Sequence, residues 1–161
     1  MKSIKLKIFS RLVFITYIIA ALYFMLFSEA MGRTIHSDTY RYNLVLFNEI
    51  NRYVSNIDTI GIGSVVLNLV GNVVCFIPFG IILPLTSDKV RKWYKVTLLM
   101  VLFSFFVEVL QLVFRIGSFD VDDIFLNVWG AVIGYIIYYC FERKIRSGKK
   151  NKTGSKNKVY K

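Results

Sequence analysis

The sequence predicts an all-α integral membrane protein, a bundle of four transmembrane helices with both termini in the cytoplasm. Three observations lead to this prediction. The chain of 161 residues is 55% hydrophobic, with a mean hydropathy of +0.53, and only 19% of its residues are charged, whereas soluble domains carry about 25%. Four stretches are long and almost free of charge. The basic residues gather on one side of these stretches.

The four apolar stretches set the number of spans. Charged residues are absent from 12–28, 59–87 and 124–141, and Glu108 is the only one in 96–114. Each stretch is close to or above the ~17–25 residues that a helix needs to cross a bilayer core. None shows the alternation of a barrel strand, so helices are expected to satisfy the backbone in lipid. We expect one membrane domain over residues 1–145, with spans at about 8–27, 60–85, 96–115 and 124–141.

The distribution of charge predicts the orientation. The formal net charge is +11, and 17 of the 21 Lys and Arg lie before the first span, around the link between the second and third, or after the fourth. Cytoplasmic loops carry an excess of Lys and Arg, so both termini of this multi-pass protein are expected inside. The basic segment 146–161 is expected to be a disordered tail near anionic headgroups. No aromatic residue interleaves it before Tyr160, which argues against nucleic-acid binding.

The first span leaves one alternative open. It could be a cleaved signal peptide, because residues 28–30 (SEA) loosely resemble a small-x-small cleavage site. Its apolar run is slightly long for a signal peptide, so we favour an uncleaved anchor. The orientation of the other three spans is the same in either case.

The longer external loop, residues 32–58, contains a candidate amphipathic helix. Leu44, Phe47, Ile50 and Val54 recur at intervals of three and four residues. This spacing is typical of a helix that lies at the outer interface, or equally of a loop helix packed on the bundle. The single histidine, His36, has no histidine or cysteine neighbour, so a metal role is not expected.

Three of the four spans carry polar side chains at intervals of three or four residues, which place them on one helix face. On all three helices these side chains are concentrated toward the external end. Polar groups in hydrocarbon are costly, so they indicate either a functional site or hydrogen bonds that lock the bundle together. We predict an outward-facing polar pocket, for which the candidate ligand-binding residues are Asn68, Asn72, Glu108, Gln111, Arg115, Asp120, Asp123 and Asn127.

Glu108 is the most costly of these groups to bury. An isolated charge in a low-dielectric medium is unfavourable, so this carboxyl is expected to be protonated or paired. Arg115 lies about 10 Å farther along the same helix. At the mouth of the pocket it is a candidate to pair with Asp120 or Asp123.

The spans also contain two closely spaced glycines and two cysteines. Gly130 and Gly134 form a GxxxG spacing, which allows close approach of a neighbouring helix. Cys75 and Cys140 lie at different depths of their spans, so we expect free thiols and no disulfide.

Four short motifs follow one another along the chain. They are RYNL at 41–44 with Phe47 close behind, NVVCFIPFG at 72–80, EVLQ at 108–111 and DVDDIFLNVWG at 120–130. In this order they resemble the VanZ-like family, whose namesake is associated with teicoplanin resistance. Leu46 departs from the family, which usually has proline there. The resemblance implies a small multi-span bacterial membrane protein, sometimes linked to lipoglycopeptide resistance, and it supplies no established reaction.

Three classes of function follow. The preferred one is a non-catalytic envelope protein whose pocket binds a membrane lipid, a lipid-linked cell-wall component or a lipoglycopeptide, and so lowers access of teicoplanin to its target. The alternative is an intramembrane enzyme acting on a cell-envelope lipid or peptide. Glu108 would be its candidate catalytic acid or base, with Asp120 and Asp123 holding a divalent ion. A transporter component would need an oligomer.

Several other chemistries are not expected. No span contains a histidine to activate a nucleophile. The chain has no His and Cys cluster for zinc and no Gly-rich phosphate loop. We therefore predict no bound metal or cofactor in the preferred function.

Overall fold

The structure is a computed structural model that describes residues 4–27 and 40–156, with the side chains of 4–26 and 40–145. Each of its long helices contains a stretch long and apolar enough to cross a membrane. The prediction of an all-α, four-span protein is therefore confirmed. The four helices are α1 (Ile4–Phe27), α4 (Ile62–Thr86), α5 (Trp93–Phe114) and α6 (Val121–Lys156).

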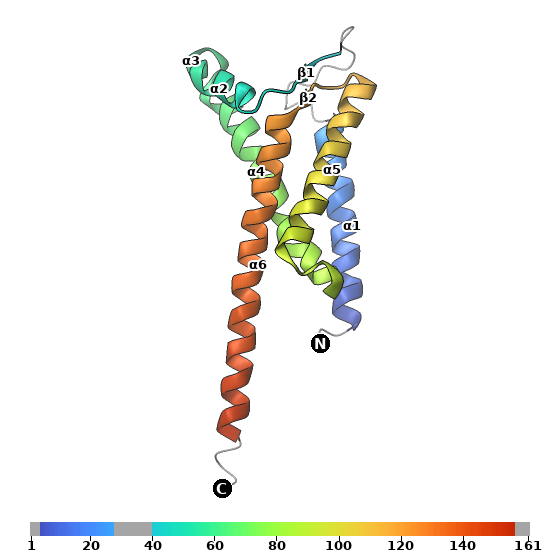
Figure 1. Cartoon of the computed structure of the whole chain (residues 1–161), viewed down its shortest axis with the longest axis vertical. Helices are drawn as coiled ribbons and strands as arrows, with labels where there is room; N and C mark the ends of the chain where they lie inside the picture. Colours follow the sequence, from blue (N-terminus) through green and yellow to red (C-terminus); the bar gives the residue numbers. More distant parts are fainter. Residues whose placement is uncertain (1–3, 28–39, 157–161) are drawn as a thin grey trace.

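The four long helices form one bundle (Figure 1). Helix α4 packs against α6 along much of its length and against α1, while α5 packs mainly on α6. The start of α1 and the end of α6 lie at the same end of the bundle, together with the 3-10 helix η2 (Asp88–Val90). The other short elements lie at the opposite end: β1 (Tyr42–Asn43), α2 (Asn48–Ser55), α3 (Ile57–Ile60) and β2 (Phe119–Asp120).

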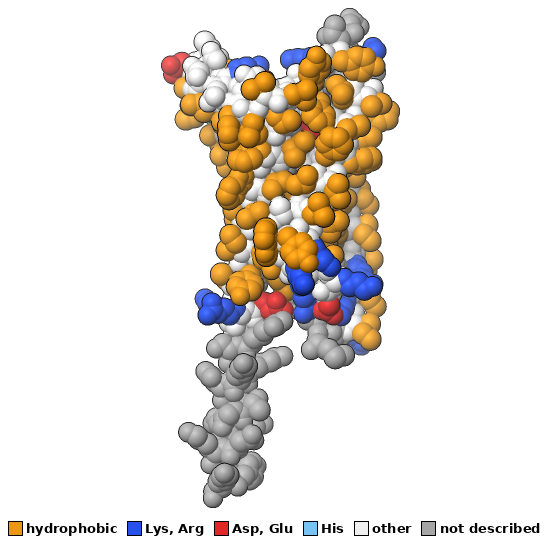
Figure 2. Space-filling view, in the orientation of Figure 1, with side chains coloured by type: hydrophobic (Ala, Val, Ile, Leu, Met, Phe, Trp, Pro, Cys, Tyr) orange, Lys and Arg blue, Asp and Glu red, His pale blue; other side chains and the backbone are white. Residues whose placement is uncertain are grey.

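The outer surface of the spans is apolar. On α5, for example, Leu102 is 56% and Phe106 is 55% exposed. Hydrophobic side chains cover the middle of the molecule, and Lys and Arg gather at its ends (Figure 2). A surface of this kind is unfavourable in water and suits the hydrocarbon of a bilayer.

Glycines allow the backbones of α4 and α6 to touch. A Cβ added at Gly130 would lie 2.1 Å from the carbonyl oxygen of Val73, and one at Gly134 would lie 2.0 Å from that of Ile77. From the α4 side, a Cβ at Gly80 would lie 2.0 Å from the carbonyl oxygen of Ala131. These distances confirm the close approach predicted from the GxxxG spacing.

Two boundaries differ from the sequence prediction. The external amphipathic helix begins at Asn48, because Phe47 has the left-handed φ of 66°. Leu44 and Phe47 therefore precede α2, although their spacing placed them in it. The backbone of α6 is helical as far as Lys156, so it includes most of the basic segment 146–161 that was expected to be disordered.

Other sequence expectations concern single residues. Cys75 and Cys140 are free thiols, as predicted. The candidate cleavage site at residues 28–30 and His36 lie outside the described residues.

Candidate functional site

A buried carboxyl of α5 meets the start of α6. Glu108 is 0% exposed, and its Oε2 accepts a hydrogen bond from the backbone N–H of Asp120 at 2.9 Å. This backbone N–H is one partner of the carboxyl, which was expected to be protonated or paired. The bond ties the polar face of α5 to the first residue before α6.

Asp120 connects three segments through its own side chain. Its Oδ1 accepts hydrogen bonds from the backbone N–H of Asp122 at 2.8 Å and from Nδ2 of Asn43 at 3.0 Å. The first is the bond of a helix N-cap, which satisfies one of the free N–H groups at the start of α6. Burial is the main cause that raises the pKa of the Asp120 carboxyl to about 6.

Asn43 reaches Asp120 because β1 and β2 pair in parallel. The register places Tyr42 opposite Phe119 and Asn43 opposite Asp120. Successive strand residues point to opposite faces. Asn43 and Asp120 accordingly bond to each other on the polar face, while Tyr42 and Phe119 line an apolar pocket on the other.

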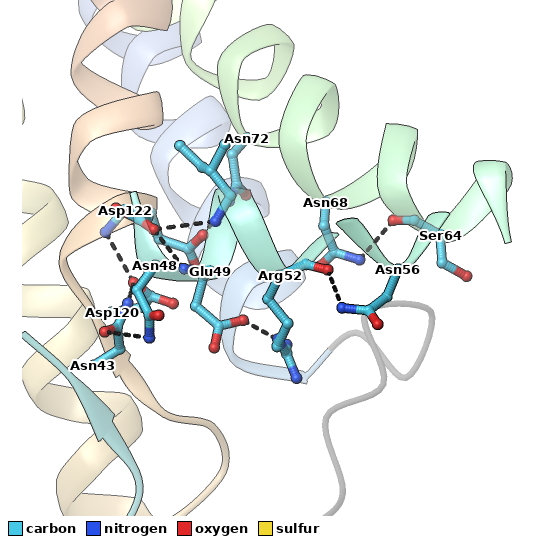
Figure 3. A network of polar contacts seen from close by, with 12 residues as sticks. Asn43, Asn48, Glu49, Arg52, Asn56, Ser64, Asn68, Asn72, Asp120 and Asp122 are labelled. Carbon is cyan, nitrogen blue, oxygen red and sulfur yellow. Dashed lines mark hydrogen bonds and ion pairs between the residues drawn. The ribbon is translucent and has the colours of Figure 1, made fainter. Parts of the chain in front are cut away.

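Asp122 holds α2 in place, a role that sequence reasoning missed (Figure 3). This carboxylate is 1% exposed and accepts backbone N–H bonds from Phe47, from Glu49 at 2.9 Å and from Ile50 at 3.2 Å. Helix N-termini favour negative charge. Here the acid comes from another helix and not from the chain just before α2. Its position beside Asp123 in an acidic run gave no signal of that long-range contact.

Below this layer, side-chain amides connect the spans. Nδ2 of Asn72 on α4 donates to Oδ1 of Asp123 on α6 at 2.6 Å. Nδ2 of Asn127 donates to Oγ of Ser104 on α5 at 2.9 Å, and both residues are 0% exposed. Such bonds between helices compensate for burying polar groups in the membrane.

Gln111 extends the network to α1. Its Nε2 donates to the backbone carbonyl oxygen of Met25 at 3.2 Å, and the side chain is 1% exposed. The polar face of α5 therefore contacts α1 through Gln111 and the α6 side through Glu108.

Two predicted site residues lie apart from the others. Nδ2 of Asn68 donates to the carbonyl oxygen of Ser64 on its own helix, at some distance from Asp120 and Asp122 (Figure 3). Arg115 is exposed, and its guanidinium lies 4.5 Å from the centre of the Tyr40 ring. The backbone at Arg115, which ends α5, is left-handed, and the pairing of this residue with Asp120 or Asp123 stays a prediction.

The converging residues are therefore Asn43, Asn72, Glu108, Asp120, Asp122 and Asp123, which we call the outer polar cluster. They come from five elements, β1, α4, α5, β2 and α6, that meet at the end of the bundle away from the chain termini. The family model described as VanZ/LLP1 matches residues 14–142, which include the whole cluster. The chain belongs to the VanZ/LLP1 family.

The relatives of this VanZ/LLP1 chain include Protein VanZ of Enterococcus faecium. The two are 33% identical over 70 residues, which make up 44% of this chain and 43% of that protein. The matched region thus spans less than half of the relative. No solved structure matches the chain.

The outer polar cluster offers hydrogen bonds and negative charge. Among the described residues, no group of three His, Cys, Asp or Glu is arranged to hold a metal ion. The oxygen atoms of Asp120 and Asp122 accept backbone and amide hydrogen bonds, so these residues fix the positions of α2, β1 and α6. Ligand binding by the predicted site residues stays a prediction.

The raised pKa of Asp120 predicts a pH-dependent stability. Because the folded-state pKa of about 6 lies above the ordinary 3.8, this group's contribution is fully present below pH 3.8 and is lost as pH rises through about 6. Asp120→Asn imitates the protonated carboxyl and should lack this loss. We expect the melting temperature of wild type in detergent to fall relative to that of Asp120→Asn from about pH 4 to about pH 6 and to change little at higher pH. Parallel pH profiles for the two proteins would contradict the assignment.

Proposed function

We propose that this VanZ/LLP1-family protein contributes to teicoplanin resistance in the bacterial plasma membrane by binding a lipid-like or amphiphilic ligand at its outer polar cluster. The observation that carries the proposal is the burial of Glu108 and the partial burial of Asp123 where α4, α5, α6 and β1 meet. Polar groups within spans are costly and commonly mark ligand sites. Family membership supports the association with teicoplanin.

The proposed orientation puts the outer polar cluster on the external side. Support comes from the four spans, which return the chain to the side where it began, and from the excess of Lys and Arg at that end. A green fluorescent protein fused after Lys161 should fluoresce, and alkaline phosphatase at the same position should be inactive. Active phosphatase would reverse the proposed orientation.

The ligand class follows from the surroundings of the cluster. A site at the outer end of the spans lies at the depth of lipid headgroups, with apolar helix surface below it. A ligand that fits both environments has a polar head and an apolar tail. Outer-leaflet lipids, lipid-linked cell-wall components and teicoplanin itself all have this character.

Resistance measurements test the proposal. A sensitive host that expresses wild type should tolerate more teicoplanin than a host with empty vector. Alanine at Glu108 or at Asp123 should abolish this protection, with equal amounts of protein in the membrane by immunoblot. Protection that survives both changes would remove the cluster from the function.

An intramembrane enzyme is the second candidate, favoured by one observation. Asp120, with its pKa of about 6, adjoins the buried Glu108 carboxyl, and acid–base catalysis works best with a pKa near the ambient pH. Purified wild type should then convert a cell-envelope lipid or peptide, and Glu108→Gln should not. Absence of turnover on extracted envelope lipids and peptides would count against this candidate.

A further inference from the structure

An apolar groove lies on the other side of the β1–β2 pair from the outer polar cluster. Its volume is about 350 Å³. The α5 residues that line it are spaced by four and three residues and so share one helix face. The lining residues are Tyr42, Leu44, Phe105, Val109, Leu112 and Phe119.

The α5 side of the groove lies on a helix long and apolar enough to cross a membrane. Phe105 and Leu112 both belong to the spanning part of α5, and the distance between them along the helix axis is about 10 Å at a rise of about 1.5 Å per residue. Tyr42 is 66%, Leu44 64% and Phe105 50% exposed. An elongated apolar groove in hydrocarbon fits part of an acyl chain.

Cationic groups lie at the outer end of this groove. Arg115 follows Leu112 by about one helical turn and is exposed over Tyr40, while Arg41 adjoins Tyr42 and is also exposed. Within the described part of the chain, neither arginine forms an ion pair with a carboxylate. Guanidinium groups bind phosphate with paired hydrogen bonds.

We infer that the groove holds one acyl chain of an anionic outer-leaflet phospholipid, whose phosphate binds Arg115 with added attraction from Arg41. The β1–β2 pair is then a shared wall: Tyr42 and Phe119 contact the acyl chain, and Asn43 and Asp120 belong to the polar cluster. The groove adjoins the outer polar cluster, so the biological meaning of this lipid site rests on the proposed function. The inference adds the class of amphiphile, an anionic phospholipid, that the protein binds there.

Tryptophan quenching by brominated lipids tests the inference. In the full-length chain carrying Trp93→Phe and Trp129→Phe, the reporter Phe105→Trp places the fluorophore in the groove. The matched control is Phe106→Trp, which is 55% exposed at nearly the same depth on the next face of α5. Proteoliposomes contain brominated phosphatidylglycerol or brominated phosphatidylcholine at equal mole fraction.

We expect phosphatidylglycerol to quench the groove reporter more strongly than phosphatidylcholine does, and the control reporter to show no preference. Arg115→Gln should reduce the preference by about fivefold, the effect of one basic residue at an anionic surface. Equal quenching by the two lipids, or the same preference at both reporters, would overturn the inference.

Two further measurements separate the possible failures. If Phe105→Trp does not fold by circular dichroism and gel filtration, Leu112→Trp replaces it, with the neighbouring Val113→Trp as its control. The quenching does not depend on resistance. Lipid preference without protection from teicoplanin would therefore overturn only the proposed function, and protection without lipid preference only the lipid site.

Discussion

Replacement of Gly134 by alanine is expected to separate α4 from α6 and to destabilise the bundle strongly. The new Cβ would lie 2.0 Å from the carbonyl oxygen of Ile77. Because that neighbour is backbone, a change of rotamer cannot relieve the clash. Overpacking typically costs about 1–3 kcal/mol and occasionally more. Thermal unfolding in detergent, followed by circular dichroism, should show a lower melting temperature than wild type.

The chain provides a matched control for this substitution. Gly63 also lies in α4, and a Cβ added there would meet nothing within 4 Å. Alanine is a better helix former than glycine by roughly 0.5–1 kcal/mol. Gly63→Ala should therefore leave the melting temperature unchanged or raise it. A similar fall for both variants would mean that the α4–α6 contact is not the cause.

Removal of the Asp122 carboxylate by alanine is expected to release α2 from the bundle. Three backbone N–H groups, those of Phe47, Glu49 and Ile50, would lose their acceptor. A hydrogen bond to a carboxylate contributes about 1.5–3 kcal/mol, which corresponds to about 13- to 150-fold faster hydrogen exchange if α2 opens locally. Exchange measured by mass spectrometry should accelerate in residues 47–55.

Two further variants serve as controls for this exchange measurement. Asp58→Ala removes an exposed carboxylate from α3 at the same end of the molecule and should leave exchange in α2 unchanged. Asp122→Asn keeps one acceptor oxygen and should give an intermediate rate. Unaltered exchange in Asp122→Ala would show that α2 is held by other contacts.

The sequence was sufficient for the parts of the fold that depend on local properties. Charge-free length predicts the spans, because each helix must satisfy its own backbone in lipid. The spacing of Gly130 and Gly134 predicts a close helix contact, and the spacing of Glu108 and Gln111 predicts a shared polar face. The structure adds the partners: α4 for the glycines, and the α6 side and α1 for the two polar residues.

The connections at the end of the bundle away from the termini could not be predicted. Two-residue strands carry no periodic signal, so the pairing of Asn43 with Asp120 depends on how the spans place two loops side by side. Asp122 acts on α2 from 73 positions away along the chain at Glu49. Asn68 shares a helix face with Asn72 and still bonds within its own helix. The sequence could not predict this difference, because periodicity does not tell how far a neighbouring helix extends.

The outer polar cluster is proposed to have a function beyond holding the bundle together. Glu108→Gln separates the two roles, because glutamine keeps the size and the hydrogen-bond acceptor of the side chain and removes its acid. The matched control is Asn68→Ala, an uncharged change outside the cluster in a neighbouring span. The measurement is the minimum inhibitory concentration of teicoplanin in a sensitive host, at equal membrane abundance and equal melting temperature.

We expect wild type and Asn68→Ala to protect the host and Glu108→Gln to give no protection. Full protection by Glu108→Gln would contradict the proposal and would assign Glu108 to the architecture of the bundle alone.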